Sequence, residues 1–266
     1  MSFESDSTLV DVFEPSPNFG PRRSGYARAD MLILHYTGME SAQAAIDWLT
    51  RPESSVSAHY LVDEAGAITQ LVMEEKRAWH AGVSHWAGED DINSCSIGIE
   101  IHNPGIELGY PDFPVPQIEA VAALCKDICG RLNIKPRRVL AHSDVAPARK
   151  PDPGEKFPWH YLHMNGVGIW APDVAIIGGA TSDEPSSDGS VLMLGDRGED
   201  VSLLQTRLKA LGYGMDVSGE YCKLTEQVVT AFQRHWRRAL VDGRADASTV
   251  ASLERVLALA LGHRVT

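Results

Sequence analysis

MLILHY, residues 31–36, is the stretch that decides the fold of this chain. Its four leading apolar residues form a continuous run of strand length, which predicts a buried β-strand. A histidine near the end of such a strand is costly to bury unless something binds its imidazole. His35 is therefore a candidate ligand, and this strand is expected to begin the core of the first domain.

The segments that follow this strand alternate between helical and β patterns. Apolar residues recur at helical spacing in residues 41–51 and 116–132. The β patterns are a hairpin at residues 59–72 and strands at residues 96–101 and 138–141. Strands interleaved with helices, with one hairpin among them, predict an α/β (α+β) domain with a mixed central sheet flanked by helices.

Two domains are expected in a chain of 266 residues, which is long enough for one full-sized core and a small second one. Residues 1–176 form the first domain, with an irregular lead-in over residues 1–29. Residues 177–190 contain almost nothing that could fill a core, which is typical of a flexible linker. Residues 191–266 carry three amphipathic segments, which predict three short helices around a small core.

Composition excludes several classes of protein. The formal net charge of -12 gives no basic face for DNA or RNA. No apolar run reaches the roughly 20 residues that a transmembrane helix needs, and the N-terminus lacks the pattern of a signal peptide. We therefore expect a cytoplasmic protein, or a protein of the periplasm or cell envelope if a leader has been removed. Cys125 and Cys129 could share a metal, but their apolar helical surroundings favour buried structural thiols.

A second group of polar residues complements His35. His142 follows a short apolar strand and is expected to lie in a loop, and the segment AHSDVAPARKPDPG then places Lys150 and Asp152 in a proline-rich loop. Two histidines at strand ends and one carboxylate suit a catalytic zinc site, which keeps a fourth position open for water. Glu100 can act as the base if its side chain points into the same cleft, and Lys150 can stabilise an oxyanion.

Spacing alone does not name an enzyme, because a lone histidine at the end of a strand is more often a satisfied core residue. The motifs LILHYTG, SAHYLVDEAGAI, AWHAG, SIGIEIHNPG and AHSDVAPARKPDPG occur in that order. Together they resemble the zinc amidases of the peptidoglycan recognition protein superfamily, the type 2 N-acetylmuramoyl-L-alanine amidases. The resemblance covers about residues 15–165.

The resemblance implies roles for individual residues. His35, His142 and Asp152 match the family's ligands for one zinc ion, and Glu100 and Lys150 match its catalytic pair. The implied fold has a substrate groove across the zinc, in agreement with the prediction from the strand and helix patterns.

Three further residues, Trp79, His80 and Asn103, are expected near this groove as substrate contacts. The alternative is that they pack the loop. His59 is expected to be a structural histidine.

The C-terminal segment resembles the three-helix peptidoglycan-binding domain that is attached to many wall hydrolases. The matching residues include Gly198, Gln205, Gly212, Gly219, Thr225, Gln233, Gly243 and Thr249. A faint repeat lies within them, since Gly219 precedes Thr225 by six residues and Gly243 precedes Thr249 by six. The segment departs from the usual pattern at Ser218 and Cys222, and a purely structural or protein-binding role is the alternative.

These patterns favour zinc-dependent hydrolysis of the amide bond between N-acetylmuramic acid and L-alanine, in peptidoglycan or its muropeptide fragments. The alternative is a non-catalytic peptidoglycan or muropeptide receptor of the same fold. Such receptors typically lack a full set of zinc ligands, whereas all three ligand positions are filled here. Small anhydro-muropeptides are a further candidate substrate, favoured by the missing signal peptide, while the appended domain favours polymeric peptidoglycan or large fragments.

Overall fold

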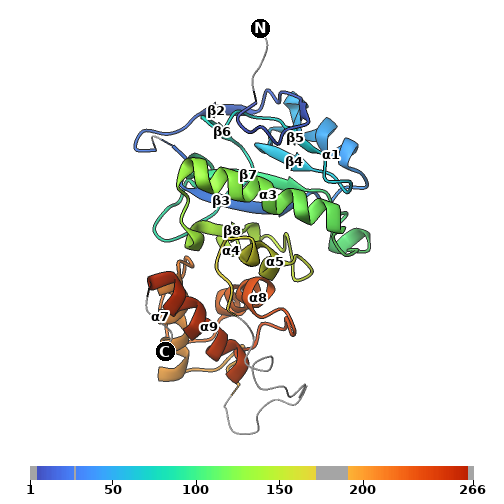
Figure 1. Cartoon of the computed structure of the whole chain (residues 1–266). Helices are drawn as coiled ribbons and strands as arrows, with labels where there is room; N and C mark the ends of the chain where they lie inside the picture. Colours follow the sequence, from blue (N-terminus) through green and yellow to red (C-terminus); the bar gives the residue numbers. More distant parts are fainter. Residues whose placement is uncertain (1–4, 27, 172–190, 263–266) are drawn as a thin grey trace.

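The computed structural model describes residues 5–26, 28–171 and 191–262, so the linker predicted at residues 177–190 lies outside the described residues. Its centre is a six-stranded mixed sheet in the order β1-β5-β4-β7-β3-β8 (Figure 1). The strands are β1 (Val12–Phe13), β3 (Met31–Tyr36), β4 (Tyr60–Val62), β5 (Ile68–Gln70), β7 (Ser96–Ile101) and β8 (Val139–Ala141). The predicted mixed sheet is confirmed, and so is the hairpin, because β4 and β5 pair antiparallel.

Two short strands lie within the lead-in that the sequence predicts to be irregular. β1 pairs parallel with β5, and β2 (Phe19–Pro21) forms a separate antiparallel pair with β6 (Lys76–Ala78). The amide of Asp11 donates to the carbonyl of Ile68 at 2.9 Å. These pairings satisfy backbone N–H and C=O groups at an edge of the sheet. Backbone hydrogen bonds of this kind can form without a periodic pattern of apolar side chains in the lead-in. Outside β1 and β2, the described residues of the lead-in form neither helix nor strand.

Alternation along the central strands divides their side chains between the two faces of the sheet. One face packs against α3 (Val115–Leu132) through a set of aliphatic side chains: Leu32, Leu34, Ile97, Ile99 and Ile101. The residues between them face the other side: Met31, Ile33, His35, Ser96, Gly98 and Glu100. Because β3 and β7 are parallel and in register, His35 lies directly beside Glu100. The catalytic candidates therefore share one face of the sheet.

The helices largely follow the predicted segments. α1 (Ala42–Leu49) begins after Ser41, whose side chain accepts a hydrogen bond from the amide of Ala44. Cys125 and Cys129 both belong to α3; Cys125 is buried in the core, Cys129 is partly buried, and both are free thiols. No helix among residues 5–26, 28–171 and 191–262 has the length and apolarity of a membrane span.

One local prediction was wrong. His142 does not lie in a loop but is the first residue of α4 (His142–Val145), which follows β8 directly. The side chain of Asp144 accepts a hydrogen bond from the amide of Ala141 at 2.8 Å. A carboxylate that accepts a hydrogen bond from a backbone amide at the start of a helix stabilises that start, so the helix can follow the strand without an intervening loop. The first domain also contains two further short α-helices, α2 (Ile92–Cys95) and α5 (Trp159–Met164), and three 3-10 helices, Pro52–Ser54, Ile106–Leu108 and Pro136–Arg138.

The C-terminal segment contains the three predicted helices, α7 (Glu199–Leu211), α8 (Lys223–Trp236) and α9 (Ala247–Leu261). The internal repeat has a structural basis in two buried glutamines. The side chain of Gln205 accepts from the amide of Gly219 at 2.9 Å and donates to the hydroxyl of Thr225 at 3.0 Å. Gln233 repeats both contacts with Gly243 and Thr249, at 2.8 and 3.2 Å.

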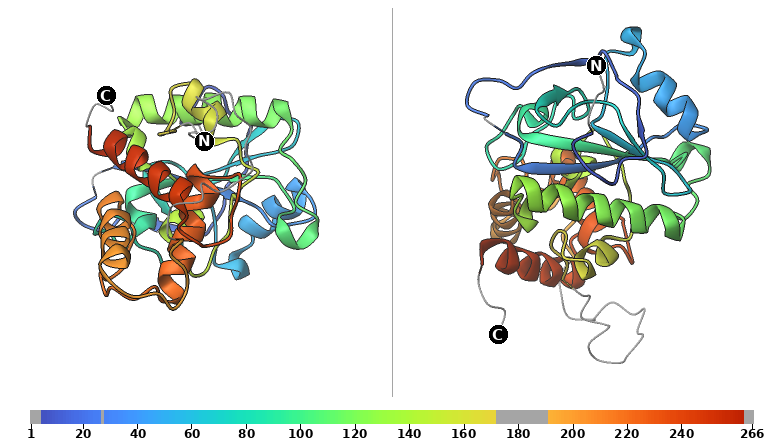
Figure 2. Two further views of the ribbon diagram at one scale, coloured as in Figure 1. Left: turned by 90° about the horizontal axis from the view of Figure 1, so that it is seen from below. Right: turned by 45° about the horizontal axis from the view of Figure 1, so that its top comes forward.

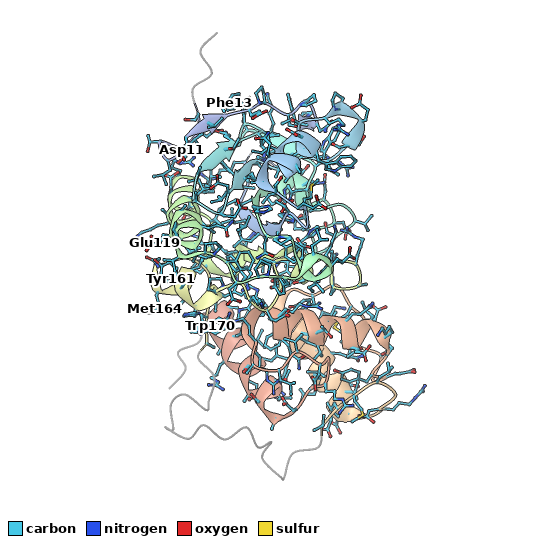
Figure 3. The ribbon with its side chains drawn as sticks, turned by 90° about the vertical axis from the view of Figure 1, so that its right-hand side faces the viewer. Asp11, Phe13, Glu119, Tyr161, Met164 and Trp170 are labelled. Carbon is cyan, nitrogen blue, oxygen red and sulfur yellow. The ribbon has the colours of Figure 1, made fainter. Side chains whose placement is uncertain are left out.

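The expectation of two separate cores is corrected by the packing. One apolar cluster runs from Met31 and Ile33, under the sheet, through Trp86 to Val228 and Phe232 of α8. Figures 1 and 2 show the C-terminal helices directly below the sheet and the α4–α5 region. Figure 3 shows Trp170 where the two parts of the chain meet. The sequence could not reveal this because an apolar stripe does not specify its partner.

Gly212 marks a tight point of this interface and generates a stability prediction. A Cβ at Gly212 (φ +139°) would lie 2.4 Å from the indole of Trp86, whereas one at Gly198 (φ +133°) would meet nothing within 4 Å. Backbone strain should cost either alanine variant about 1–3 kcal/mol, and overpacking should cost Gly212→Ala about 1–3 kcal/mol more.

Thermal unfolding of the two variants tests this expectation. Gly212→Ala should unfold at a lower temperature than Gly198→Ala, by roughly 2–4 °C for each kcal/mol of difference. Equal midpoints would contradict a close contact between Gly212 and Trp86.

Candidate metal centre and active site

Three donor atoms from distant parts of the chain converge at one end of the sheet. Nδ1 of His35 lies 2.9 Å from Nδ1 of His142 and 3.2 Å from Oδ2 of Asp152, and the remaining pair is 3.0 Å apart. All three residues are buried, and they are the one group of this kind found in the described parts of the chain. The structure thus brings together the three predicted ligands.

The hydrogen bond of His142 determines which of its ring nitrogens is free. Nε2 of His142 lies 3.1 Å from the carbonyl oxygen of Ala81. Because a carbonyl can only accept, Nε2 carries the hydrogen and donates it. In the neutral imidazole, Nδ1 is then an unprotonated acceptor that points at His35 and Asp152.

A chain of hydrogen bonds determines the tautomer of His35 in the same way. The Ser96 hydroxyl donates to the carbonyl of Ile92 at 2.6 Å, so its oxygen accepts from Nε2 of His80 at 3.1 Å. Nδ1 of His80 is therefore an acceptor, and it lies 3.0 Å from Nε2 of His35. His35 consequently donates through Nε2 and keeps Nδ1 free.

When both rings are neutral, two imidazole lone pairs and a carboxylate oxygen therefore face one another. Burial, followed by the charge of His142, lowers the pKa of His35 to about 4. Burial acts to raise the pKa of Asp152, but His142 and His35 together hold it well below its usual range. Such a set repels itself unless a cation lies among its members, and bonds of about 2.0–2.1 Å to zinc place tetrahedral ligands roughly 3.3 Å apart. The residues present fit a divalent metal.

A cavity of about 550 Å³ opens over these donors. Its lining includes all three of them together with aromatic, acidic and basic side chains: Trp48, Trp79, His80, Glu100, Glu107, Arg149 and Lys150. Oε2 of Glu100 is buried with no hydrogen-bond partner. Burial, and then the charge of Asp152, raise the pKa of Glu100 well above its usual range. Glu100 therefore lines the same cavity as His35, as its predicted role as a base requires.

The three predicted substrate contacts lie in different surroundings. Trp79 and His80 line the cavity, but both ring nitrogens of His80 are engaged by His35 and Ser96. Asn103 is 2% exposed and is not part of the lining. Its amide binds the backbone of Pro111 and Gly105 at 2.9 Å each, which is a loop-packing arrangement. A substrate role for these residues stays a prediction, and that of Asn103 has no support in its contacts.

Residues without a predicted site role complete the surroundings. His59 is buried and accepts from the amide of Gly98 at 3.0 Å, which agrees with its structural assignment. A Cβ at Gly98 would lie 2.4 Å from the ring of His80, so glycine leaves room for that imidazole. The sequence offered a clue to this packing, because a glycine inside a strand often marks the close approach of another group to the backbone. Ser96 carried no comparable signal.

Comparisons with known proteins agree with this geometry. The family described as N-acetylmuramoyl-L-alanine amidase matches residues 25–155. The chain is 36% identical to N-acetylmuramoyl-L-alanine amidase AmiD of Escherichia coli over 252 residues, which cover 88% of this chain and 84% of AmiD. The chain belongs to the N-acetylmuramoyl-L-alanine amidase family. A peptidoglycan binding domain family matches residues 197–253.

Solved amidase structures share the whole fold. A complex of Escherichia coli AmiD with its substrate anhydro-N-acetylmuramic acid-L-Ala-D-gamma-Glu-L-Lys has a TM-score of 0.74 at 35% identity, covering 91% of this chain and 93% of that one. AmpDh3 of Pseudomonas aeruginosa, bound to anhydromuramic pentapeptide, has a TM-score of 0.70 at 30% identity, covering 96% and 98%. The amidase is therefore an enzyme, and the receptor alternative has no support.

The contacts of His80 generate a prediction about metal affinity. His80→Ala removes the acceptor that orients His35, and should weaken zinc binding about 10–100-fold. His80→Asn should bind zinc more tightly than His80→Ala, because its side-chain oxygen replaces the Nδ1 acceptor. Competition with a chromophoric chelator measures both dissociation constants.

Ser143→Ala is the matched control for this measurement. Ser143 is adjacent to His142 and fully buried, yet its hydroxyl has no hydrogen-bond partner. Its removal should leave zinc affinity unchanged. Unchanged affinity in His80→Ala as well would show that the orientation of His35 does not depend on His80.

Proposed function

We propose that the amidase binds one zinc ion per chain through His35, His142 and Asp152 and cleaves the bond between N-acetylmuramic acid and L-alanine. The observation that carries this proposal is the convergence of three buried metal-ligating atoms, two ring nitrogens and one carboxylate oxygen, within 3.2 Å of one another. Two imidazoles and one carboxylate form a donor set typical of a catalytic zinc, with a position left for water. A bound zinc supplies a Lewis acid and lowers the pKa of its water to about 7.

Glu100 is the proton carrier in this proposal. Its carboxylate stands beside His35 in register and has one oxygen without a partner, so it can accept a proton from the attacking water. A raised pKa favours the protonated state that follows, and the carboxyl then donates the proton to the amine that leaves with L-alanine. Its position allows both steps because it shares the cavity with the metal ligands.

Lys150 supplies positive charge on the same cavity wall. It lies two residues before Asp152 and lines the cavity with Arg149. When water attacks the amide carbonyl, negative charge develops on the carbonyl oxygen. We assign to Lys150 the stabilisation of that oxygen by a charge-assisted hydrogen bond.

The substrate proposal rests on the shape and chemistry of the cavity. Trp48 and Trp79 offer apolar faces against which a sugar ring can pack, and Arg149 offers a cation to the carboxylates of a stem peptide. The AmiD and AmpDh3 structures that match this fold hold anhydromuramyl peptides. We propose muropeptide fragments, including anhydro forms, as substrates of this amidase.

The C-terminal domain is proposed to bind polymeric peptidoglycan. A second cavity of about 360 Å³ lies along α7 and α9 and is lined by apolar and charged side chains, among them Leu203, Asp200 and Glu254. Polar groups at the edge of an apolar groove suit a glycan or peptide ligand. This role would concentrate the enzyme on insoluble substrate.

Two substitutions separate the roles of metal ligand and base. His35→Ala should lose both zinc and activity, since two ligands are too few for tight binding. Glu100→Gln should retain one zinc but lose about 10²–10⁴-fold in turnover. Metal analysis together with mass spectrometry of released peptide checks both. Full activity in a metal-free His35→Ala protein would refute the zinc mechanism.

Product analysis tests the bond and the substrate. Intact sacculi and purified anhydro-muropeptide are each incubated with the amidase, with and without a chelator. We expect free peptide starting at L-alanine from both, and none when the chelator is present. Release from anhydro-muropeptide alone would restrict the enzyme to fragments, and products cut at another bond would contradict the proposal.

A further inference from the structure

We infer that Tyr213 and His235, in the C-terminal domain, are positioning residues of the metal centre. They hold the side chain of Asp144, and through it the turn from β8 to α4 that carries His142. The inference rests on the proposed function, because it takes His142 as a metal ligand. It makes the C-terminal domain a structural part of the active site, in addition to any role in binding peptidoglycan.

Three hydrogen bonds converge on the carboxylate of Asp144, which is fully buried. Oδ1 accepts from the hydroxyl of Tyr213 at 2.7 Å. Oδ2 lies 2.6 Å from Nδ1 of His235 and accepts from the amide of Ala141 at 2.8 Å. The first two partners come from the C-terminal domain and the third immediately precedes His142. The Asp144 side chain thus links the two domains at the metal-binding turn.

The ring of His235 is held in place by aromatic packing. It stacks on Trp159 of α5 and on Trp236 of α8, with ring centroids 3.7 Å apart in both cases. Trp159 belongs to the first domain, so the imidazole is sandwiched between the two. Stacking on both faces holds the plane of the ring in which Nδ1 meets Asp144.

The C-terminal domain also supports the loop that contacts the other side of His142. The carbonyl of Gly212 accepts from the amide of Ala87 at 2.7 Å, and Tyr213 packs against Trp86 with centroids 4.9 Å apart. Earlier in the same loop, the carbonyl of Ala81 accepts from Nε2 of His142. Backbone and ring of His142 are therefore both held by segments on which the C-terminal domain packs.

A precise ligand geometry requires that the residues behind the ligands be fixed. If Asp144 loses a donor, the turn that carries His142 gains freedom, and part of the zinc binding energy must be used to order it. Docking and zinc binding are then thermodynamically linked, so that each strengthens the other. A domain that only tethers the enzyme to the wall would show no such linkage.

Two tyrosines of the C-terminal domain provide a matched test. Tyr213 and Tyr221 are 1% and 0% exposed, and each donates its hydroxyl at 2.7 Å. Tyr213 donates to Asp144, whereas Tyr221 donates to the carbonyl of Gly243 within its own domain. Tyr213→Phe and Tyr221→Phe in the full chain therefore remove the same group from equally buried sites.

Zinc affinity is measured by competition with a chelator, and hydrogen exchange of the amides at residues 141–146 is measured in the metal-free protein. Tyr213→Phe should weaken zinc binding about tenfold, at the low end of effects for outer-shell partners, and should speed exchange in this segment. Tyr221→Phe should change neither, even if it lowers the unfolding temperature. His235→Asn, which can keep a donor near the Nδ1 position, should bind zinc more tightly than His235→Ala.

Unchanged zinc affinity and unchanged exchange in Tyr213→Phe would overturn the inference, and so would equal losses in the two tyrosine variants. Failure of the proposed function has a different signature, since the unsubstituted amidase would then bind no zinc at His35, His142 and Asp152. Exchange at residues 141–146 in the metal-free protein would still report whether Tyr213 holds the turn. The two failures are therefore distinguishable.

Discussion

The active site of this amidase is organised by one electrostatic constraint. When both imidazoles are neutral, Nδ1 of His35, Nδ1 of His142 and Oδ2 of Asp152 are all acceptors, and they lie within 3.2 Å of one another in a buried site. Lone pairs at this separation repel unless a cation lies between them. The surrounding hydrogen bonds fix the tautomers, because Ala81 and His80 engage Nε2 of His142 and of His35 and leave both Nδ1 atoms free in the neutral rings.

The central sheet supplies the framework for this arrangement. Alternation sends the aliphatic residues of β7 towards α3 and sends Ser96, Gly98 and Glu100 to the opposite face. Each of these three residues has a separate consequence for the site. Ser96 sets the tautomer of His80, Gly98 leaves space for the same ring, and Glu100 stands beside His35. A single strand therefore contributes to the orientation of the ligand His35, to the packing of His80 and to the proposed proton transfer.

The two domains of this amidase are packed together. Here one apolar cluster passes through both, and the buried carboxylate of Asp144 receives donors from each side. Packing of this kind couples the stability of one domain to the site geometry in the other. Close-packed side chains and buried hydrogen bonds depend on their neighbours, so a change on one side of the boundary affects the other.

The sequence by itself determined the elements and the chemistry of their ends. An apolar run closing on His35, the alternation in SIGIEI and the helical stripes of the C-terminal segment depend on local periodicity, which is visible in one dimension. The five ordered motifs indicated the amidase family and the candidate ligands. Only the tertiary structure decided the distances between ligands, the tautomers of His35 and His142, the pairing of the lead-in with β5 and the docking of the C-terminal helices. These features depend on contacts between residues far apart in the chain, and no local pattern records which distant group will satisfy a given hydrogen bond or apolar face.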